Sequence, residues 1–144
     1  VSWSRGLGDV YKRQDSKPEF VWMNAESIGD NDPALNYYSN LPAVFIFDKP
    51  LLNYLQLSTK RIIFLLDCLR ELANKRSTQV YLDNPIEYLK NKNFASTFAA
   101  VPKYKKITRV NIPTTEFPSV RLVKPINFYP SSYSSWKKRI ELNI

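Results

Sequence analysis

The sequence predicts an α/β fold, a Rossmann-like three-layer domain with a mainly parallel five-stranded sheet and helices on both faces. Short apolar runs alternate with segments of helical periodicity, which is typical of parallel strands joined by right-handed crossovers. The run Ala43–Phe47 is apolar throughout, as in a strand buried on both faces. A length of 144 residues corresponds to a single domain.

The first part of the chain predicts two strands separated by a short helix. Glu19–Met23 is aromatic and β-branched and predicts the first strand, and Ala43–Phe47 predicts the second. Between them, Asp32 is a good N-cap and Pro33 suits the first helical position. We therefore expect a helix over Ala34–Ser39.

A longer amphipathic helix is expected over Ser58–Lys75. Its apolar residues recur at the spacing of one helical face, namely Ile62, Leu65, Leu66, Leu69 and Leu72. Ser58 or Thr59 can cap its start. Lys75 and Arg76 lie at its C-terminal end, where the helix dipole favours cations.

The rest of the chain predicts three more strands, over Thr78–Leu82, Phe94–Val101 and Val120–Val123. Asn84 followed by Pro85 predicts the start of a short helix. Lys106–Asn111 fits either a strand extension or a loop. Pro125–Lys138 is aromatic and Ser-rich, and we expect it to be irregular.

Composition excludes several classes of site. The chain has no His and a single Cys, Cys68, so the usual zinc sets and the Ser-His and Cys-His nucleophile pairs are absent, and we expect no metal site. No apolar stretch is long enough to span a bilayer, and we expect a cytoplasmic domain without membrane contact. The net charge of +8 suits nucleic acid or an anionic cofactor, or reflects only a Lys-rich solvated surface.

Residues 1–14 do not fit the sequence that follows them. They hold two of the three Gly and resemble a translated sequencing adapter, without the features of a signal peptide. We therefore treat residues 1–17 as a non-native or disordered segment and expect the domain to occupy residues 18–140. The chain is then expected to be either a free-standing domain or a piece of a longer protein.

Conventional phosphate loops are absent from the sequence. It has no GxGxxG or Walker A pattern, and Gly29 is the only Gly after residue 14. Glu26, Asp30 and Asp32 follow the first strand, where they either bind a cation, orient a ligand, or only cap a helix and solvate a loop. Arg61 opens the long helix, where it either meets an anionic group or extends along the helix surface.

Two clusters suggest contact surfaces. Lys103, Lys105, Lys106 and Arg109 surround Tyr104, a pattern that fits nucleic acid or an edge strand protected by Lys. Aromatic residues gather near the C-terminus, where they fit either packing against a second domain or stacking on a flat ligand: Phe128, Tyr129, Tyr133 and Trp136.

Several segments together resemble the N-terminal α/β domain of the photolyase/cryptochrome family. Val21-Trp-Met-Asn-Ala-Glu-Ser-Ile-Gly-Asp-Asn-Asp-Pro-Ala-Leu35 resembles the family's Val-Trp-Phe opening and its Asp-Asn-Pro-Ala-Leu motif. Pro42–Asp48 is similar to its second strand, and Arg61–Leu72 to its Arg-x-x-Phe-Leu-x-x-Ser-Leu-x-x-Leu helix. Val80–Pro85 stands where a family strand runs into Gly-Asp-Pro. Lys124–Trp136 resembles the segment that closes the domain.

The resemblance implies a domain that holds an antenna chromophore of deazaflavin, folate or flavin type, or that scaffolds a flavoprotein. Strand-end geometry together with the resemblance gives the pocket candidates Asn24, Glu26, Phe47, Asp48, Arg61 and Lys103. Two departures stand out. Residues 24–28 replace the family's Arg-Asp-Leu-Arg core, and Val101–Lys103 replace the Asn and Glu that commonly lie near the antenna.

The family's helical domain, which holds FAD and the DNA lesion, has no counterpart in the sequence. We therefore expect no FAD site in this chain and no deoxyribodipyrimidine photolyase activity from it alone, with the FAD-binding helical domain either missing or a separate chain. The alternative is a basic module that binds DNA or a helical partner without catalysis. Its contact candidates are Lys105, Lys106, Arg109, Phe128, Tyr129 and Trp136.

Overall fold

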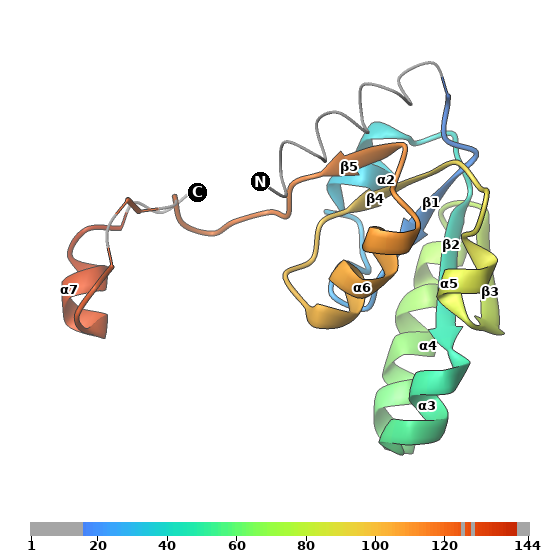
Figure 1. Cartoon of the computed structure of the whole chain (residues 1–144), viewed down its shortest axis with the longest axis horizontal. Helices are drawn as coiled ribbons and strands as arrows, with labels where there is room; N and C mark the ends of the chain where they lie inside the picture. The colour runs from blue at the N-terminus through green and yellow to red at the C-terminus, as the bar shows by residue number, and fades with distance from the viewer. Residues whose placement is uncertain (1–15, 125, 128, 141–144) are drawn as a thin grey trace.

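The computed structural model describes residues 16–124, 126–127 and 129–140, and its centre is a five-stranded sheet (Figure 1). The strand order is β3-β2-β1-β4-β5, and every neighbouring pair is parallel. The strands are β1 (Phe20–Met23), β2 (Ala43–Asp48), β3 (Thr78–Asp83), β4 (Phe94–Thr97) and β5 (Thr115–Phe117). The predicted fold class is confirmed.

Capping residues explain where most of the helices begin. The helices are α2 (Pro33–Tyr37), α3 (Lys49–Leu55), α4 (Thr59–Ala73), α5 (Pro85–Tyr88), α6 (Pro102–Val110) and α7 (Tyr133–Lys137). The side chains of Asp32, Asp48, Ser58 and Asn84 each accept a hydrogen bond from a backbone N–H in the first turn of the helix that follows. A Pro follows three of these four caps within two residues.

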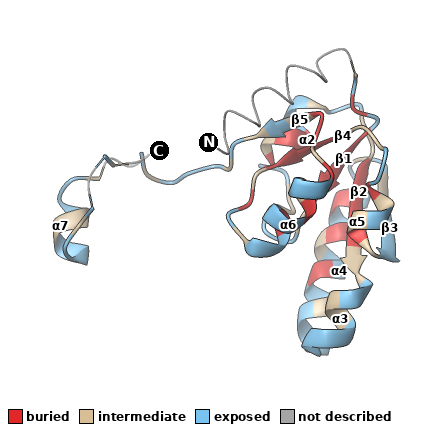
Figure 2. Cartoon of the chain, in the orientation of Figure 1, coloured by how far each residue is buried: buried red, intermediate tan, exposed pale blue. Residues whose placement is uncertain are grey.

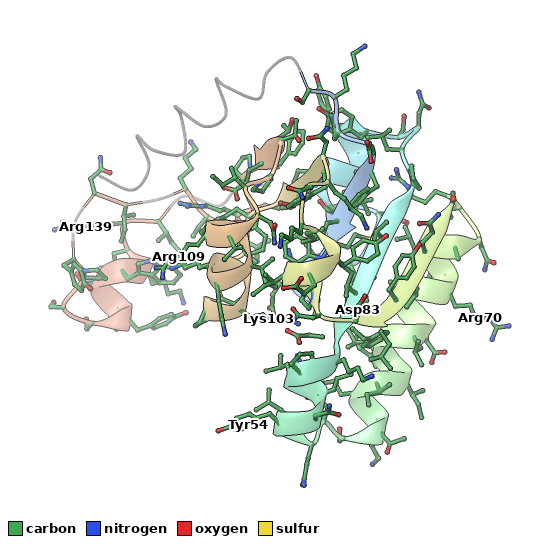
Figure 3. All side chains as sticks on the ribbon, turned by 45° about the vertical axis from the view of Figure 1, so that its right-hand side comes forward. Tyr54, Arg70, Asp83, Lys103, Arg109 and Arg139 are labelled. Atoms are coloured by element: carbon green, nitrogen blue, oxygen red, sulfur yellow. The ribbon has the colours of Figure 1, made fainter. Side chains whose placement is uncertain are left out.

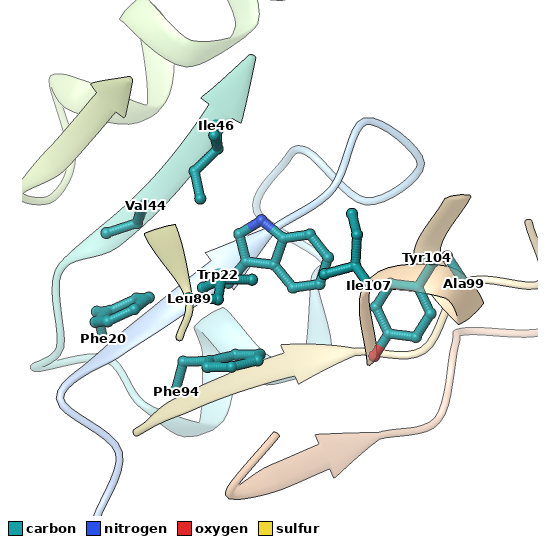
Figure 4. Packing of buried hydrophobic residues seen from close by; sticks show 9 residues of the cluster. All are labelled: Phe20, Trp22, Val44, Ile46, Leu89, Phe94, Ala99, Tyr104 and Ile107. Carbon is teal, nitrogen blue, oxygen red and sulfur yellow. The ribbon is translucent and has the colours of Figure 1, made fainter. Parts of the chain in front are cut away.

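Alternation along the strands divides the core between the two faces of the sheet. Phe20, Trp22 and Phe94 pack with Tyr104 and Ile107 of α6 on one face (Figure 4). The opposite face is formed by the alternate strand residues and by α2 and α4, and its buried residues include Val21, Met23, Phe45, Leu69 and Leu72. Burial is concentrated in β1, β2, β4 and one side of α4 (Figure 2).

The structure corrects the predictions for the segment after β4. Phe94–Val101 was predicted as one strand, but β4 ends at Thr97. Lys106–Asn111, predicted as strand or loop, lies mainly in α6. Pro102 starts this helix, and Tyr104 and Ile107, three residues apart, bury one of its faces.

The fifth strand also differs from its prediction. It is Thr115–Phe117, which pairs in parallel with β4, whereas Val120 and Leu122 are exposed outside the sheet. The sequence did not predict α3, and the segment predicted to be irregular contains α7. The prediction for residues 1–17 falls, apart from its last two residues, outside the described part of the chain.

Candidate functional site

The sheet has a switch point between β1 and β4. The chain leaves β1 toward β2 on one side, and β4 lies on the other side of β1, so the loops that follow β1 and β4 diverge. Ligands of open α/β sheets bind in the crevice that such loops leave at the carboxyl ends of the strands. A cavity of about 500 Å³ lies here, lined by residues 26–33, 97–101 and 119–120.

Buried hydrogen bonds tie the two walls of this switch-point cavity together. The Thr97 hydroxyl at the end of β4 donates to the carboxylate of Asp32, which precedes α2. The backbone N–H of Ala34 donates to the same carboxylate at 2.9 Å and lies 3.2 Å from the Thr97 hydroxyl oxygen. Asp32 is 4% exposed, and these bonds place its acidic group in the cavity wall.

Asn24 makes a second link between the two strand ends. Its Nδ2 donates to the backbone oxygen of Thr97 at 3.2 Å, and its Oδ1 accepts from the backbone N–H of Glu26 at 3.0 Å. Both polar ends of the Asn24 side chain are therefore used to hold the loop after β1. The Glu26 side chain is exposed at the rim of the cavity.

Two smaller cavities continue along the carboxyl edge of the sheet. One of about 60 Å³ lies beside Trp22 and Tyr104, and it shares Glu26 and Val101 with the switch-point cavity. The next, of about 260 Å³, lies where α3, α5 and α6 meet, and it shares Lys103 with its neighbour. The three together form an uneven groove along the edge.

Lys106 and Lys103 both line this groove, and Lys103 lies beside an acidic residue. The Lys103 Nζ lies 3.7 Å from Oδ2 of Asp48, the residue whose Oδ1 caps α3. Burial lowers the pKa of the Lys103 ammonium, and the nearby Asp48 charge partly opposes that effect. Figure 3 labels Lys103 on the side of α6 that faces α3.

Tyr104 forms a polar contact beneath the groove. Its ring stacks on Trp22 with centroids 5.6 Å apart, and its hydroxyl bonds to Ser96 Oγ at 2.8 Å and donates to Glu116 Oε2 at 2.7 Å. Burial raises the pKa of the Tyr104 phenol well above its ordinary value. The phenol is therefore neutral at physiological pH and serves to hold α6 on the sheet.

The structure brings together four of the six predicted pocket residues. Asn24, Glu26 and Lys103 line the cavity beside Trp22, and Asp48 joins Lys103 in the next one. The other two lie elsewhere. Phe47 packs against Phe45 in the core on the α2 and α4 side, with ring centroids 5.0 Å apart. Arg61 is exposed in the first turn of α4, outside these cavities.

The predicted contact residues fall into two groups. Lys105, Lys106 and Arg109 lie on the exposed face of α6, opposite buried Tyr104. Tyr129 and Trp136 lie in the C-terminal segment, whose helix α7 stands away from the sheet (Figure 1). Phe128 lies outside the described residues.

The sequence did not predict most of the cavity wall that follows β4, in particular Phe98, Ala99 and Ala100. These residues were missed because the predicted strand continued through them. The signal that places them in a loop is Pro102, which begins α6 and ends the preceding extended segment. Ser119 and Val120, on the same wall, were missed because the last strand was expected there.

Other classes of site find no support in the described part of the chain. Its Cys, Asp and Glu side chains include no group of three or more placed to hold a metal ion. No helix among the described residues combines the length and apolarity needed to cross a membrane. Comparison of the chain with protein-family models, curated proteins and solved structures gave no match.

Proposed function

We propose that this chain is a photolyase/cryptochrome-like α/β domain that binds a flat antenna chromophore in the switch-point cavity. The observation that carries the proposal is the position of that cavity, between the loops after β1 and β4 at the carboxyl edge of a parallel sheet. The order and spacing of the motifs that resemble this family along the sequence support the family part of the proposal. The proposal assigns no catalysis to these residues.

The size and lining of the cavity suit such a ligand. Pockets for small molecules measure roughly 300–1,000 Å³, and this one is about 500 Å³. Phe98, Ala99 and Val101 give it apolar walls, while Asp32 and Glu26 offer acceptors to N–H or O–H groups at the edge of a ring system. The loop after β1 is acidic and contains no Gly other than Gly29, so it does not suit a phosphate group. The part of the ligand that binds there is therefore the ring system.

Titration of the purified protein with three pigments tests this proposal. Riboflavin phosphate, a deazaflavin and a reduced folate are each added while absorbance and fluorescence above the aromatic band are followed. We expect one of them to bind, and Ala100→Trp to weaken that binding at least about tenfold by filling the cavity, a cost of about 1.4 kcal/mol.

A matched control lies at the opposite end of the strands. Val110 lines a cavity of about 510 Å³ at the amino ends of the strands, so Val110→Trp adds the same side chain to a cavity of similar size. This variant is expected to bind the pigment like the wild type. Absence of binding for all three pigments, or equal weakening by both variants, contradicts the proposal.

A second candidate function is a basic module that contacts nucleic acid. What favours it is α6, which carries four cations, Lys103, Lys105, Lys106 and Arg109, and no acidic residue. Lys105 and Arg109 lie one helical turn apart, as do Lys106 and Arg109, so one exposed face holds three of these charges. Such a face can follow a phosphate backbone.

The salt dependence of DNA binding distinguishes the two candidates. Neutralising about three phosphates gives a slope of log affinity against log salt near −3 on duplex DNA. On this candidate, Arg109→Glu weakens binding and flattens the slope, whereas Lys60→Glu, which makes the same charge change on α4, does not. If the salt slope is the same in Arg109→Glu as in the wild type, the nucleic-acid candidate is contradicted.

A further inference from the structure

The edge strand β3 is exposed although its central residues, Val80, Tyr81 and Leu82, are apolar or aromatic. Five of its six residues are exposed, and the apolar side chains of Val80 and Leu82 are 43% and 61% exposed. Strands of parallel sheets are ordinarily covered on both faces. Val80 and Leu82 lie beside Phe45 and Phe47 in the register with β2, so they belong to the face that α4 covers.

The outer edge of β3 also lacks the features that prevent strands from pairing. In the described part of the chain β3 pairs only with β2. It contains no Pro, Gly, Lys or Arg, and its one charged residue, Asp83, lies at its last position. The other edge strand, β5, has only three residues and carries Glu116 at its centre. Because natural sheets shorten or charge their free edges, β3 is the edge suited to pairing.

Charge indicates what kind of partner fits this side of the molecule. The chain carries +8 overall, but β3 and α4 together carry three cations and three acids along their exposed positions. These residues are Lys60, Arg61, Arg70, Asp67, Glu71 and Asp83. Figure 3 labels Asp83 at the end of β3 and Arg70 on the outer side of α4. A balanced surface attracts no strongly charged partner and does not repel a second copy of itself.

We propose that β3 pairs antiparallel with β3 of a second copy of this chain, joining the two sheets across a twofold axis. A twofold axis perpendicular to the sheet relates two antiparallel strands without exchanging the faces of the sheet. Two residues that oppose each other across the axis must therefore point to the same face. An axis at Tyr81 satisfies this requirement and opposes Val80 with Leu82.

This register is complementary to itself. Val80 and Leu82 of each copy form an apolar group of four side chains on the α4 face. The two copies of Tyr81 meet on the opposite face. Asp83 opposes Gln79, an uncharged amide, so no like charges face each other directly.

The mass of the full chain in solution tests the proposal. Light scattering coupled to gel filtration at micromolar concentration is expected to give twice 16.8 kDa. Leu82→Lys places a cation against the apolar group and is expected to give the monomer mass. Leu122→Lys makes the same change at a site that is 79% exposed outside the sheet, and it is expected to leave the dimer intact.

Cross-linking tests the register directly. In a Cys68→Ser background, the thiols introduced by Tyr81→Cys lie directly opposite, where Cα atoms about 5 Å apart permit a disulfide. Those introduced by Val80→Cys lie about 8 Å apart, which is beyond its reach. We expect mild oxidation to link the first variant only.

Three results would overturn the inference. A wild-type chain that is monomeric at these concentrations means that β3 is covered by something else or stays open. A dimer that survives Leu82→Lys, with circular dichroism unchanged, forms through another surface. Equal cross-linking of Tyr81→Cys and Val80→Cys excludes the proposed axis.

Discussion

Thr97 donates its hydroxyl hydrogen to the carboxylate of Asp32 across the switch point of the sheet, and both residues are buried. The two lie 65 residues apart in the sequence. One hydrogen bond therefore joins the end of β4 to the start of α2 and sets how the loops on either side of the cavity diverge. The candidate site and the local stability of the fold depend on the same pair.

Thr97→Val is expected to destabilise the protein. The change keeps the shape of the side chain but removes a donor from a buried carboxylate, which costs about 1–3 kcal/mol in unfolding free energy. Urea denaturation measures it. Thr108→Val is the control, because the Thr108 hydroxyl donates to backbone carbonyls of its own helix, those of Tyr104 and Lys105. Equal losses in the two variants would show that the Thr97–Asp32 bond adds nothing.

Tyr104 is expected to make stability fall at alkaline pH. Burial raises the pKa of its phenol, whereas in the unfolded chain it ionises near its ordinary value of about 10. Above that pH the unfolded state binds fewer protons than the folded state, so stability falls as pH rises. Below it the contribution is fully present. Unfolding free energies across this range should fall less steeply in Tyr104→Phe.

Tyr37→Phe is the matched control for the alkaline measurement, since Tyr37 is 70% exposed. It should leave the pH slope as in the wild type. Tyr88, whose pKa burial raises to about 12, contributes in the same direction and remains in both variants. A slope that Tyr104→Phe leaves unchanged would show that its phenol ionises equally in both states.

Hydrophobic pattern and capping signals were sufficient to predict most of the sheet. Ala43–Phe47 has few alternatives to a buried strand, and Asp32-Pro33 specifies a helix start through one side-chain bond and one fixed φ. The same cap signal precedes α3, at Asp48 and Pro50, directly after the predicted strand Ala43–Phe47, but no helix was predicted there. A cap signal can therefore mark both the end of a strand and the start of a helix.

The segment around α6 shows why the rest was not predictable. Lys103–Arg109 alternates closely enough to resemble an edge strand, and only Tyr104 and Ile107 have helical spacing. The segment forms a helix because Tyr104 and Ile107 are buried in the cluster that contains Trp22. That contact joins residues far apart in the chain. The position of Arg61 was not predictable for a similar reason. Its distance from the groove depends on how far α4 extends beyond the sheet.

Arg76→Lys is expected to destabilise the fold more than its conservative chemistry suggests. The guanidinium donates to the backbone oxygens of Leu35, at 2.9 Å, Tyr38, at 2.7 Å, and Leu41, which lie in α2, at its C-cap and in the loop after it. A lysine ammonium lacks the planar fork that reaches all three. We expect a loss of about 1–3 kcal/mol in thermal or urea unfolding, against little change for Arg70→Lys, which is exposed on α4. Equal losses would contradict this.

Lys103 is expected to react with an amine-acylating reagent at lower pH than Lys105, its exposed neighbour on α6. Burial lowers the pKa of the Lys103 ammonium, so a larger fraction is neutral and nucleophilic at a given pH. Asp48→Asn should lower that pKa further, because it removes the opposing charge while an Asn at this position still caps α3. Peptide mapping after acylation over a pH series measures both sites together. A rate for Lys103 that follows Lys105, or that slows in Asp48→Asn, contradicts the assigned environment.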